Sequence, residues 1–411
     1  MDNKPTFTPE QIDAIEQSGR NILVSAGAGS GKTTVLSQRV LKHIMTDRIS
    51  VNDMLIVTFT VAAAASMKEK IYKVVQDAYY ETNQEYLWRE AVRINSAEIC
   101  TIDSFQAKFL REFFNLAGVS PDFTTLDDTE RGAMEADILD DILERRYSKP
   151  TEEFMQMLEL FGGEGENEGL KDAINELYDY LRAVPFRDKW LDDKLSAYDS
   201  AETWVDSVCS ELLPGLQDAA DAFRAGCMSM SESKQLPALQ AESESAERML
   251  EACRAKDIEL MGDIARRYLA SRGRITFSSK EPVQQRCRRF RSLFKDICEM
   301  SLFDPRVCRN IASDLKRLRG GISALFDVEK EYGALIRAKC AELNRYSFDE
   351  ISSLTLELAV KNYNPSDGSF EPTELALQVR DRYKEIMIDE YQDTNDRQDL
   401  FFRAISNDNL F

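Results

Sequence analysis

A glycine-rich segment near the start of the chain has the composition of a loop that binds phosphate. Residues 26–33 are AGAGSGKT, and they lie between an apolar run at Asn21–Ser25 and a helical pattern that begins at Lys32. Glycines let successive backbone N–H groups turn toward an anion, and the helix start adds its positive end. Lys32 would then reach the β and γ phosphates of a nucleotide, and Thr33 would place its hydroxyl on Mg²⁺. The alternative is a glycine-rich turn without a ligand, and the general pattern expects Gly rather than Ala at position 26.

An acidic pair late in the chain could supply the metal and water chemistry that such a loop needs. Asp389 and Glu390 directly follow the apolar run Glu385–Ile388. In phosphoryl transfer, one carboxylate at a strand end holds Mg²⁺ and another residue orients the attacking water. We predict the first role for Asp389 and the second for Glu390. Alone, such a pair is more often a turn or a helix cap, so its combination with the loop is what favours catalysis.

The elements around these residues alternate between strands and helices. Apolar runs predict strands at 21–25, 54–58, 98–102 and 385–388, and helical patterns cover 32–45, 61–80, 104–116, 373–382 and 395–405. This alternation is typical of a parallel α/β sheet. Ahead of the first strand, Thr8 to Gln11 has the pattern of a helix start with a capping box.

The middle of the chain has a different pattern. From about Thr129 to Asn344 it is rich in Leu, Glu and Arg at helical spacing, with predicted turns at Gly162-Gly163, Ser229–Ser233 and Gly320-Gly321. We therefore expect one α/β domain made of residues 1–126 and 346–411. A large all-helical domain, residues 127–345, would be inserted into it.

Composition excludes several classes of protein. The chain has 411 residues, of which 43% are hydrophobic and 30% charged, as in globular proteins. No apolar run approaches the roughly 18 residues that span a bilayer, so we predict a cytoplasmic protein without a membrane partner. The eight cysteines form no C-x-x-C pair, and His43 is the single histidine. Catalysis would therefore use carboxylates, Lys or Thr rather than a His triad or a His metal site.

Charge is distributed unevenly along the chain. The net charge is −20, which opposes indiscriminate binding to nucleic acid, yet Arg254–Arg319 holds 17 Lys and Arg against 8 Asp and Glu. This basic stretch could line a path for a polyanion, or it could be a solvated helix face with scattered ion pairs. Its central cations are Arg266, Arg267, Arg272, Arg274, Lys280, Arg286, Arg288, Arg289, Arg291 and Lys295.

Five short segments each lie just before or just after a predicted strand. They are FTPEQ before the first strand, AGAGSGKT after it, VTFTVAAAASMKEKI after the second, TIDSF after the third and IDEYQDTN after the last. In order and context they resemble motifs Q, I, Ia, Ib and II of UvrD/Rep-like superfamily 1 helicases. That family writes the loop as A-x-A-G-[ST]-G-K-T, so Ala26 fits it. The long helical insertion and the run ELALQVRDRYKEIMIDEYQDTNDRQDLFFRAIS look most like AddA, the helicase-nuclease component of bacterial AddAB complexes.

The resemblance implies a RecA-like P-loop NTPase domain and roles for single residues. Gln11 would read adenine with both faces of its amide, and Gln392 would link the γ-phosphate to the DNA-binding side. The implied catalytic residues are Glu390, Lys32 and Gln392, and the implied metal ligands are Thr33 and Asp389. The residues implied to bind ATP are Gln11, Ala26, Gly27, Ala28, Gly29, Ser30, Gly31, Lys32, Thr33 and Thr34.

The resemblance also implies contacts with single-stranded DNA. The residues concerned are Thr58, Phe59, Thr60, Ser104 and Phe105. Phe offers a stacking face for a base, and Thr and Ser hydroxyls bond phosphates without reading sequence. The alternative is ordinary packing at strand ends, above all for Phe105. Asp103 departs from the family, since many relatives have His in T-x-H-S-F, and Phe7 stands where AddA proteins often have Trp.

The implied function is that of an ATP-dependent 3′–5′ DNA helicase and translocase subunit. It would use ATP and Mg²⁺, act on single-stranded and duplex-end DNA in double-strand break repair and recombination, and pair with an AddB-like helicase-nuclease subunit. Because no resemblance to motif III or to a nuclease signature follows, we expect an amino-terminal piece that is nearly inactive alone. Two alternatives stay open, a stand-alone UvrD-like repair helicase without nuclease and a non-motor ATP-binding regulator.

Overall fold

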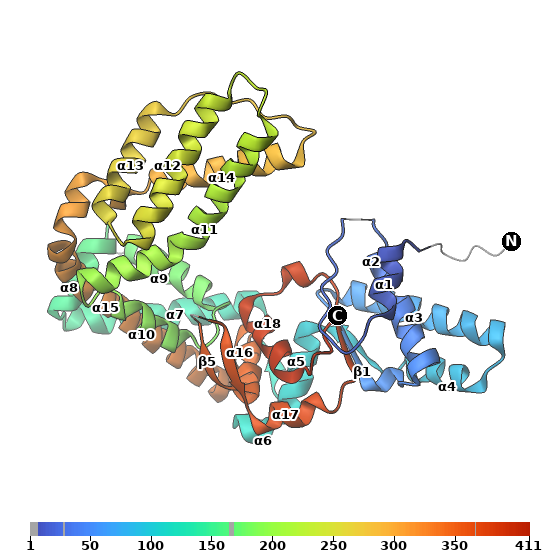
Figure 1. Ribbon diagram of the computed structural model, residues 1–411. Helices are drawn as coiled ribbons and strands as arrows, with labels where there is room; N and C mark the ends of the chain where they lie inside the picture. Colours follow the sequence, from blue (N-terminus) through green and yellow to red (C-terminus); the bar gives the residue numbers. More distant parts are fainter. Residues whose placement is uncertain (1–6, 28, 164–167, 366) are drawn as a thin grey trace. The chain divides into compact units, whose positions relative to one another are not determined.

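The computed structural model describes residues 7–27, 29–163, 168–365 and 367–411 (Figure 1). The chain forms two compact units. Unit 1 runs up to Glu144 and also contains Asn175–Trp190 and Lys330–Phe411, and unit 2 contains Arg145–Ile174 and Leu191–Glu329. Among the described residues, no helix combines the length and the apolar character needed to cross a membrane.

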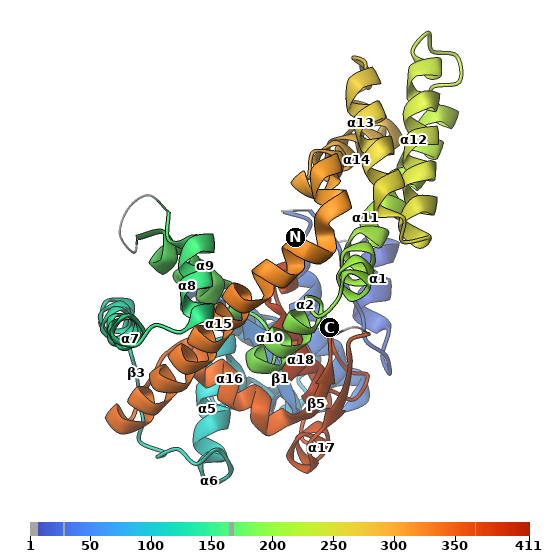
Figure 2. The same cartoon turned by 90° about the vertical axis from the view of Figure 1, so that its left-hand side faces the viewer.

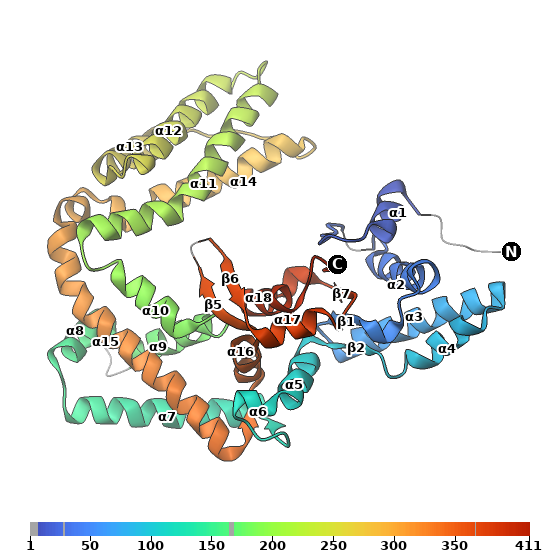
Figure 3. The ribbon, with the colours of Figure 1, turned by 60° about the horizontal axis from the view of Figure 1, so that its bottom comes forward.

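Unit 1 is built around a parallel sheet. Its strands are β1 (Met54–Thr58), β2 (Glu98–Thr101) and β7 (Glu385–Ile388), in the order β2-β1-β7 (Figure 3). Central β1 is buried along its whole length, as expected for a parallel strand covered on both faces. The strands predicted at 54–58, 98–102 and 385–388 and their parallel arrangement are therefore confirmed.

Helices cover both faces of this sheet because successive strand residues point to opposite sides. Met54 and Ile56 pack with α2 (Lys32–Lys42), α3 (Val61–Thr82) and α4 (Glu85–Arg93). Leu55 and Val57 pack with α5 (Ile102–Glu112), α16 (Phe348–Ala359), α17 (Glu374–Arg380) and α18 (Asp396–Ile405). Smaller elements of unit 1 are α1 (Pro9–Glu16), η1 (His43–Asp47), η2 (Val51–Asp53), α6 (Phe114–Ala117), β3 (Thr124–Thr125), β4 (Arg345–Tyr346), β5 (Val360–Asn364), β6 (Ser369–Pro372) and η4 (Tyr391–Asp393).

The strand predicted at Asn21–Ser25 is not formed. Its clearest sheet-like bond runs from the Ile22 N–H to the Leu410 carbonyl, at 2.8 Å, and Leu23 is 76% exposed. Leu410 itself forms a parallel bridge with Ile386 of β7, so this short stretch lies between β7 and the segment. The prediction was wrong because apolar composition alone does not make a strand, which needs a ladder of backbone bonds to a neighbour.

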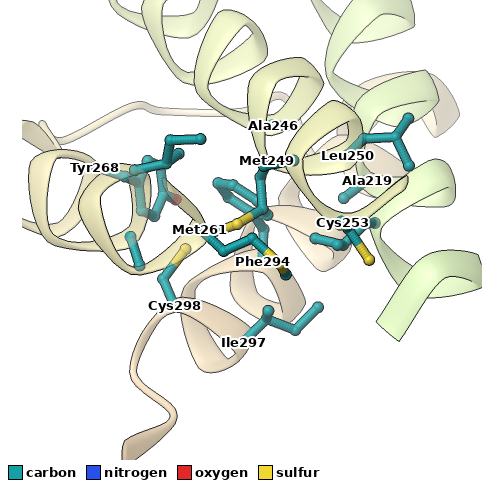
Figure 4. Close-up of a cluster of buried hydrophobic side chains, with 14 of the residues drawn as sticks. Ala219, Ala246, Met249, Leu250, Cys253, Met261, Tyr268, Phe294, Ile297 and Cys298 are labelled. Atoms are coloured by element: carbon teal, nitrogen blue, oxygen red, sulfur yellow. The ribbon is translucent and has the colours of Figure 1, made fainter. Parts of the chain in front are cut away.

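Among its described residues, unit 2 contains helices joined by loops and no strand. Its own helices are α8 (Glu152–Phe161), α11 (Ala201–Ser229), α12 (Leu236–Arg254), α13 (Ile258–Ser271) and α14 (Pro282–Cys298), with the short η3 (Ser301–Phe303). The division between the units falls within α7 (Asp128–Ser148), α9 (Glu168–Leu181), α10 (Arg187–Ser196) and α15 (Pro305–Leu343). Helices α11 to α14 pack against one another (Figure 2). Phe294, Met249, Met261 and Tyr268 meet in their common core (Figure 4).

Gly320-Gly321 does not form the predicted turn but lies inside α15. A Cβ on Gly320 would collide with the side-chain amide of Gln156, and one on Gly321 would lie 2.6 Å from Leu160 Cδ1. The two glycines therefore let α8 approach α15 closely, which is a packing role rather than a turn. The turns predicted at Gly162-Gly163 and Ser229–Ser233 do follow helix ends, those of α8 and α11.

Candidate functional site

The glycine-rich loop leads directly into α2, whose first residue is Lys32. Gly29 and Gly31 have φ angles of +77° and +85°, in the left-handed region that L side chains rarely adopt. Gly31 is the N-cap of α2 and brings no side-chain cap, so the first N–H groups of the helix are left for another acceptor. The loop thus has the backbone shape and the helix end of an anion site. Predicted Ala28 lies outside the described residues.

The acidic pair lies opposite this loop. The Asp389 N–H donates to the Val57 carbonyl at 2.9 Å, which extends the pairing of β7 with β1 by one residue. Glu390 then turns out of the strand with φ +57°. As a result, Lys32 Nζ lies 3.5 Å from Glu390 Oε2. Residues 358 positions apart in the sequence therefore meet, as the predicted phosphate lysine and the predicted water-orienting carboxylate should.

Gln392 joins the same contact, because its Nε2 donates to Glu390 Oε2 at 2.5 Å. This bond and the charge of Lys32 lower the pKa of Glu390. Burial instead raises the pKa of Asp389, with repulsion from Glu390 as the second cause. Of the two carboxylates, Glu390 is therefore the one that keeps its negative charge more readily.

A cavity of 530 Å³ adjoins these residues. It is lined by Lys32, Asp389, Glu390, Gln392, segment 21–25, Val35, Leu36, Ile388, Tyr391, Arg403, Leu410 and Phe411. Its lining combines the charged groups of Lys32, Asp389 and Glu390 with apolar side chains such as Val35, Leu36 and Ile388. Such a combination suits a ligand with a charged end and an apolar body.

Gln11 also reaches the loop, from α1. The predicted capping box is present, with the Gln11 N–H bound to Thr8 Oγ1 at 3.3 Å and the Thr8 N–H bound to Gln11 Oε1 at 2.9 Å. The other end of the amide, Nε2, donates to the Ser30 carbonyl at 2.9 Å. Each end of the Gln11 amide thus has one protein partner, which leaves its second N–H and the second lone pair of its oxygen for the adenine that the resemblance implies.

The predicted DNA-contact residues divide into two groups. Thr60 and Ser104 are exposed near the N-termini of α3 and α5, and Phe59 is half-buried between β1 and α3. Thr58 and Phe105 are each only 2% exposed. Phe105 packs against Phe109, Phe401 and Phe402 and has no free face for a base. Tertiary packing therefore covers Thr58 and Phe105, and we remove these two from the expected contacts.

The basic stretch contains both cations that are paired with carboxylates and exposed cations that are available to a polyanion. Arg291 is buried and bonded to Glu242, and Arg266, Arg286 and Lys295 pair with Asp263, Asp218 and Glu299. Another group is exposed and forms no ion pair within the described part of the chain. These residues are Arg267, Arg274, Lys280, Arg288 and Arg289.

The chain belongs to the UvrD/REP helicase N-terminal domain family, whose model matches residues 7–411. Its relatives include the A subunit of the ATP-dependent helicase/nuclease of Acetivibrio thermocellus, 28% identical over 99% of this chain and 34% of the relative. The same protein of Listeria innocua is 28% identical over 98% of this chain and 34% of the relative. The chain spans about a third of the length of these curated relatives. The resemblance predicted from the five motifs is confirmed.

Proposed function

We propose that this chain is the ATP-binding part of a DNA helicase motor. The observation that carries the proposal is the contact of Lys32, Glu390 and Gln392 between the start of α2 and the end of β7. In this view unit 1 contains a RecA-like domain, formed by residues 1–126 and 346–411, and residues 127–345 are a helical insertion. Membership of the UvrD/REP family supports the same assignment.

The residues present fit a magnesium nucleotide. The left-handed glycines and the helix end without a side-chain cap suit phosphate oxygens, and the Asp389 carboxylate with the Thr33 hydroxyl form a donor set of hard oxygens that Mg²⁺ accepts. Mg²⁺ would neutralise charge on the phosphates when bound. When the nucleotide binds, Lys32 would leave Glu390 and bind the phosphates, because the phosphates carry more negative charge than one carboxylate. Glu390 would then accept a hydrogen bond from the attacking water.

The proposed DNA contacts are Phe59, Thr60 and Ser104. Strands β1 and β2 are parallel neighbours, so their carboxyl ends meet at one edge of the sheet, where ligands bind in α/β folds. Thr60 and Ser104 present hydroxyls there, and Phe59 an aromatic ring. Single-stranded DNA is bound by this combination without regard to sequence.

The relatives are named as helicase/nuclease proteins, and their names support a wider proposal for the whole protein. It would be a cytoplasmic 3′–5′ helicase that uses ATP and Mg²⁺, pairs with an AddB-like protein and acts on duplex ends and single strands in break repair. These names favour it over a stand-alone UvrD-like helicase.

ATP hydrolysis by the whole protein, with and without single-stranded DNA, tests the proposal. A motor should hydrolyse ATP faster when DNA is present, because DNA binding and ATP turnover share one domain. A protein that binds ATP but shows no DNA-stimulated turnover would instead be a regulator. Degradation of duplex ends by the whole protein would distinguish a helicase-nuclease from a helicase without nuclease activity.

A further inference from the structure

Helix α1 carries Gln11 but has no buried residue that would fix the helix to the rest of unit 1. None of its residues is buried: of its two isoleucines, Ile15 is half-buried and Ile12 is 43% exposed. A helix of 8 residues is also too short to be stable by itself in water. Something outside α1 must therefore fix it beside the phosphate loop.

Arg39 of α2 provides that attachment. It is 1% exposed, and its Nη1 donates to the Ala14 carbonyl at 2.8 Å and to the Gln17 carbonyl at 2.6 Å. The Ile15 carbonyl is also within reach, at 3.3 Å. These are carbonyls at the C-terminal end of α1, which have no partner inside the helix and carry partial negative charge. A buried cation at this end satisfies them.

The same guanidinium is anchored on its other side to β7. Its Nε and Nη2 lie 2.7 Å and 2.6 Å from Glu385 Oε1. Glu385 is the first residue of β7, whose far end leads into Asp389 and Glu390. The Phe411 ring lies 4.5 Å from the guanidinium carbon. One planar side chain therefore joins α1, α2 and the strand that leads to the acidic pair.

We propose that Arg39 is a positioning residue for adenine recognition, which it supports by holding α1 so that Gln11 stays at the phosphate loop. The inference rests on the proposed nucleotide site. It goes further in assigning nucleotide selectivity to a buried side chain that lies outside the glycine-rich loop and bonds only protein groups in this structure. Gln11 can bond the loop at Ser30 only while α1 keeps this place.

Arg39→Lys is the informative variant. Lysine keeps a positive charge opposite Glu385, so the core is not left with an unpaired buried carboxylate. A single ammonium cannot reproduce the planar fork that bonds β7 on one side and α1 on the other. The variant should therefore loosen α1 without unfolding unit 1. Arg380→Lys is a matched control, because Arg380 also donates to a carbonyl near a helix end, that of Ala404, at 3.0 Å.

The experiment measures dissociation constants of Mg-ATP and Mg-GTP for the parent chain, Arg39→Lys, Gln11→Ala, the double variant and Arg380→Lys. The parent should prefer ATP. Arg39→Lys and Gln11→Ala should each lower this preference by about tenfold, the loss expected for one or two hydrogen bonds, with GTP affinity within about twofold of the parent. The double variant should lose no more than Gln11→Ala alone, since both changes remove the same interaction.

Hydrogen exchange supplies a second readout. In Arg39→Lys the amides of residues 12–17 should exchange faster, while those of β1 and β7 stay as protected as in the parent. If Arg39→Lys does not fold, Arg39→Met with Glu385→Gln replaces the pair by neutral groups and should give the same two results.

Unchanged ATP preference in the folded Arg39 variants, or losses that add in the double variant, would overturn the inference. An equal loss in Arg380→Lys would also overturn it, because it would show a general effect of altered helix ends. Failure of the parent chain to bind either nucleotide would instead contradict the proposed function.

Discussion

At the scale of single residues, the site depends on an arrangement in which one carboxylate has three neighbours of different kinds. Glu390 faces Lys32, accepts a bond from Gln392 and follows the half-buried Asp389. Its pKa is lowered, so the carboxylate is ionised at neutral pH and can accept a hydrogen bond from the attacking water. The backbone N–H of Asp389 is bonded to β1, which fixes its Cα at the strand end and suits a metal ligand.

This division of roles predicts that Glu390→Gln separates binding from turnover. The amide keeps the size of the side chain but loses the charge that would orient and polarise water. In the whole protein we expect hydrolysis to fall about a hundredfold or more, with Mg-ATP affinity within about threefold of the parent. Turnover and equilibrium binding are measured side by side, with Glu374→Gln, on the exposed start of α17, as the control. Loss of ATP binding in Glu390→Gln would show that its role is structural.

Residue types predicted the loop and the acidic pair because their chemistry is local in sequence. Phe105 was less predictable, since the rings that cover it, Phe401 and Phe402, lie almost 300 positions away. Arg39 gave no signal for the same reason. Its partners are in α1 and at Glu385, and an arginine in the helix after a phosphate loop could equally be solvated.

At the scale of elements, helical periodicity and apolar runs predicted most helices and three of the strands. The failures at 21–25 and Gly320-Gly321 have one cause, which is that neighbours in space decide the outcome. A strand forms only where a partner offers a ladder, and a glycine pair forms no turn where a second helix uses it for close packing.

The glycine pair gives a matched test in two helices. Gly321→Ala places a methyl group against Leu160 and the Gln156 backbone, so we expect a loss of about 1–3 kcal/mol in the free energy of unfolding. Gly132 lies in α7 with open space around its Cβ position, and Gly132→Ala should stabilise by up to about 1 kcal/mol. Urea unfolding of both variants measures the difference. Stabilisation by both substitutions would mean that α8 does not pack closely on Gly321.

At the scale of the whole molecule, the uneven charge is the feature with consequences for DNA. The net charge of −20 repels a polyanion, so any attraction must come from local surfaces such as the exposed cations of α13, α14 and the loop between them. Since several cations of the stretch are already paired with carboxylates, only the others are available to phosphates.

Reversal of the charges of Arg274, Arg288 and Arg289 to Glu should therefore weaken DNA binding of the whole protein equally for all sequences and flatten its dependence on salt concentration. Reversal of the paired cations Arg266, Arg286 and Lys295 is the control and should have a smaller effect. Titrations at several salt concentrations measure both. Unchanged affinity and salt dependence in the first variant would make the stretch a solvated helix face.

The nucleotide site itself is tested most directly by calorimetric titration of Mg-ATP into the 411-residue chain and its Lys32→Ala variant. Lys42→Ala is the control, because Lys42 ends the same helix and bonds Asp47 at 2.7 Å, away from the loop. We expect Lys32→Ala to weaken binding by at least about tenfold, since a charge-assisted bond to phosphate is lost, and Lys42→Ala to change it by less than about twofold. Equal Mg-ATP affinity in the parent and folded Lys32→Ala chains would contradict the assignment of this loop.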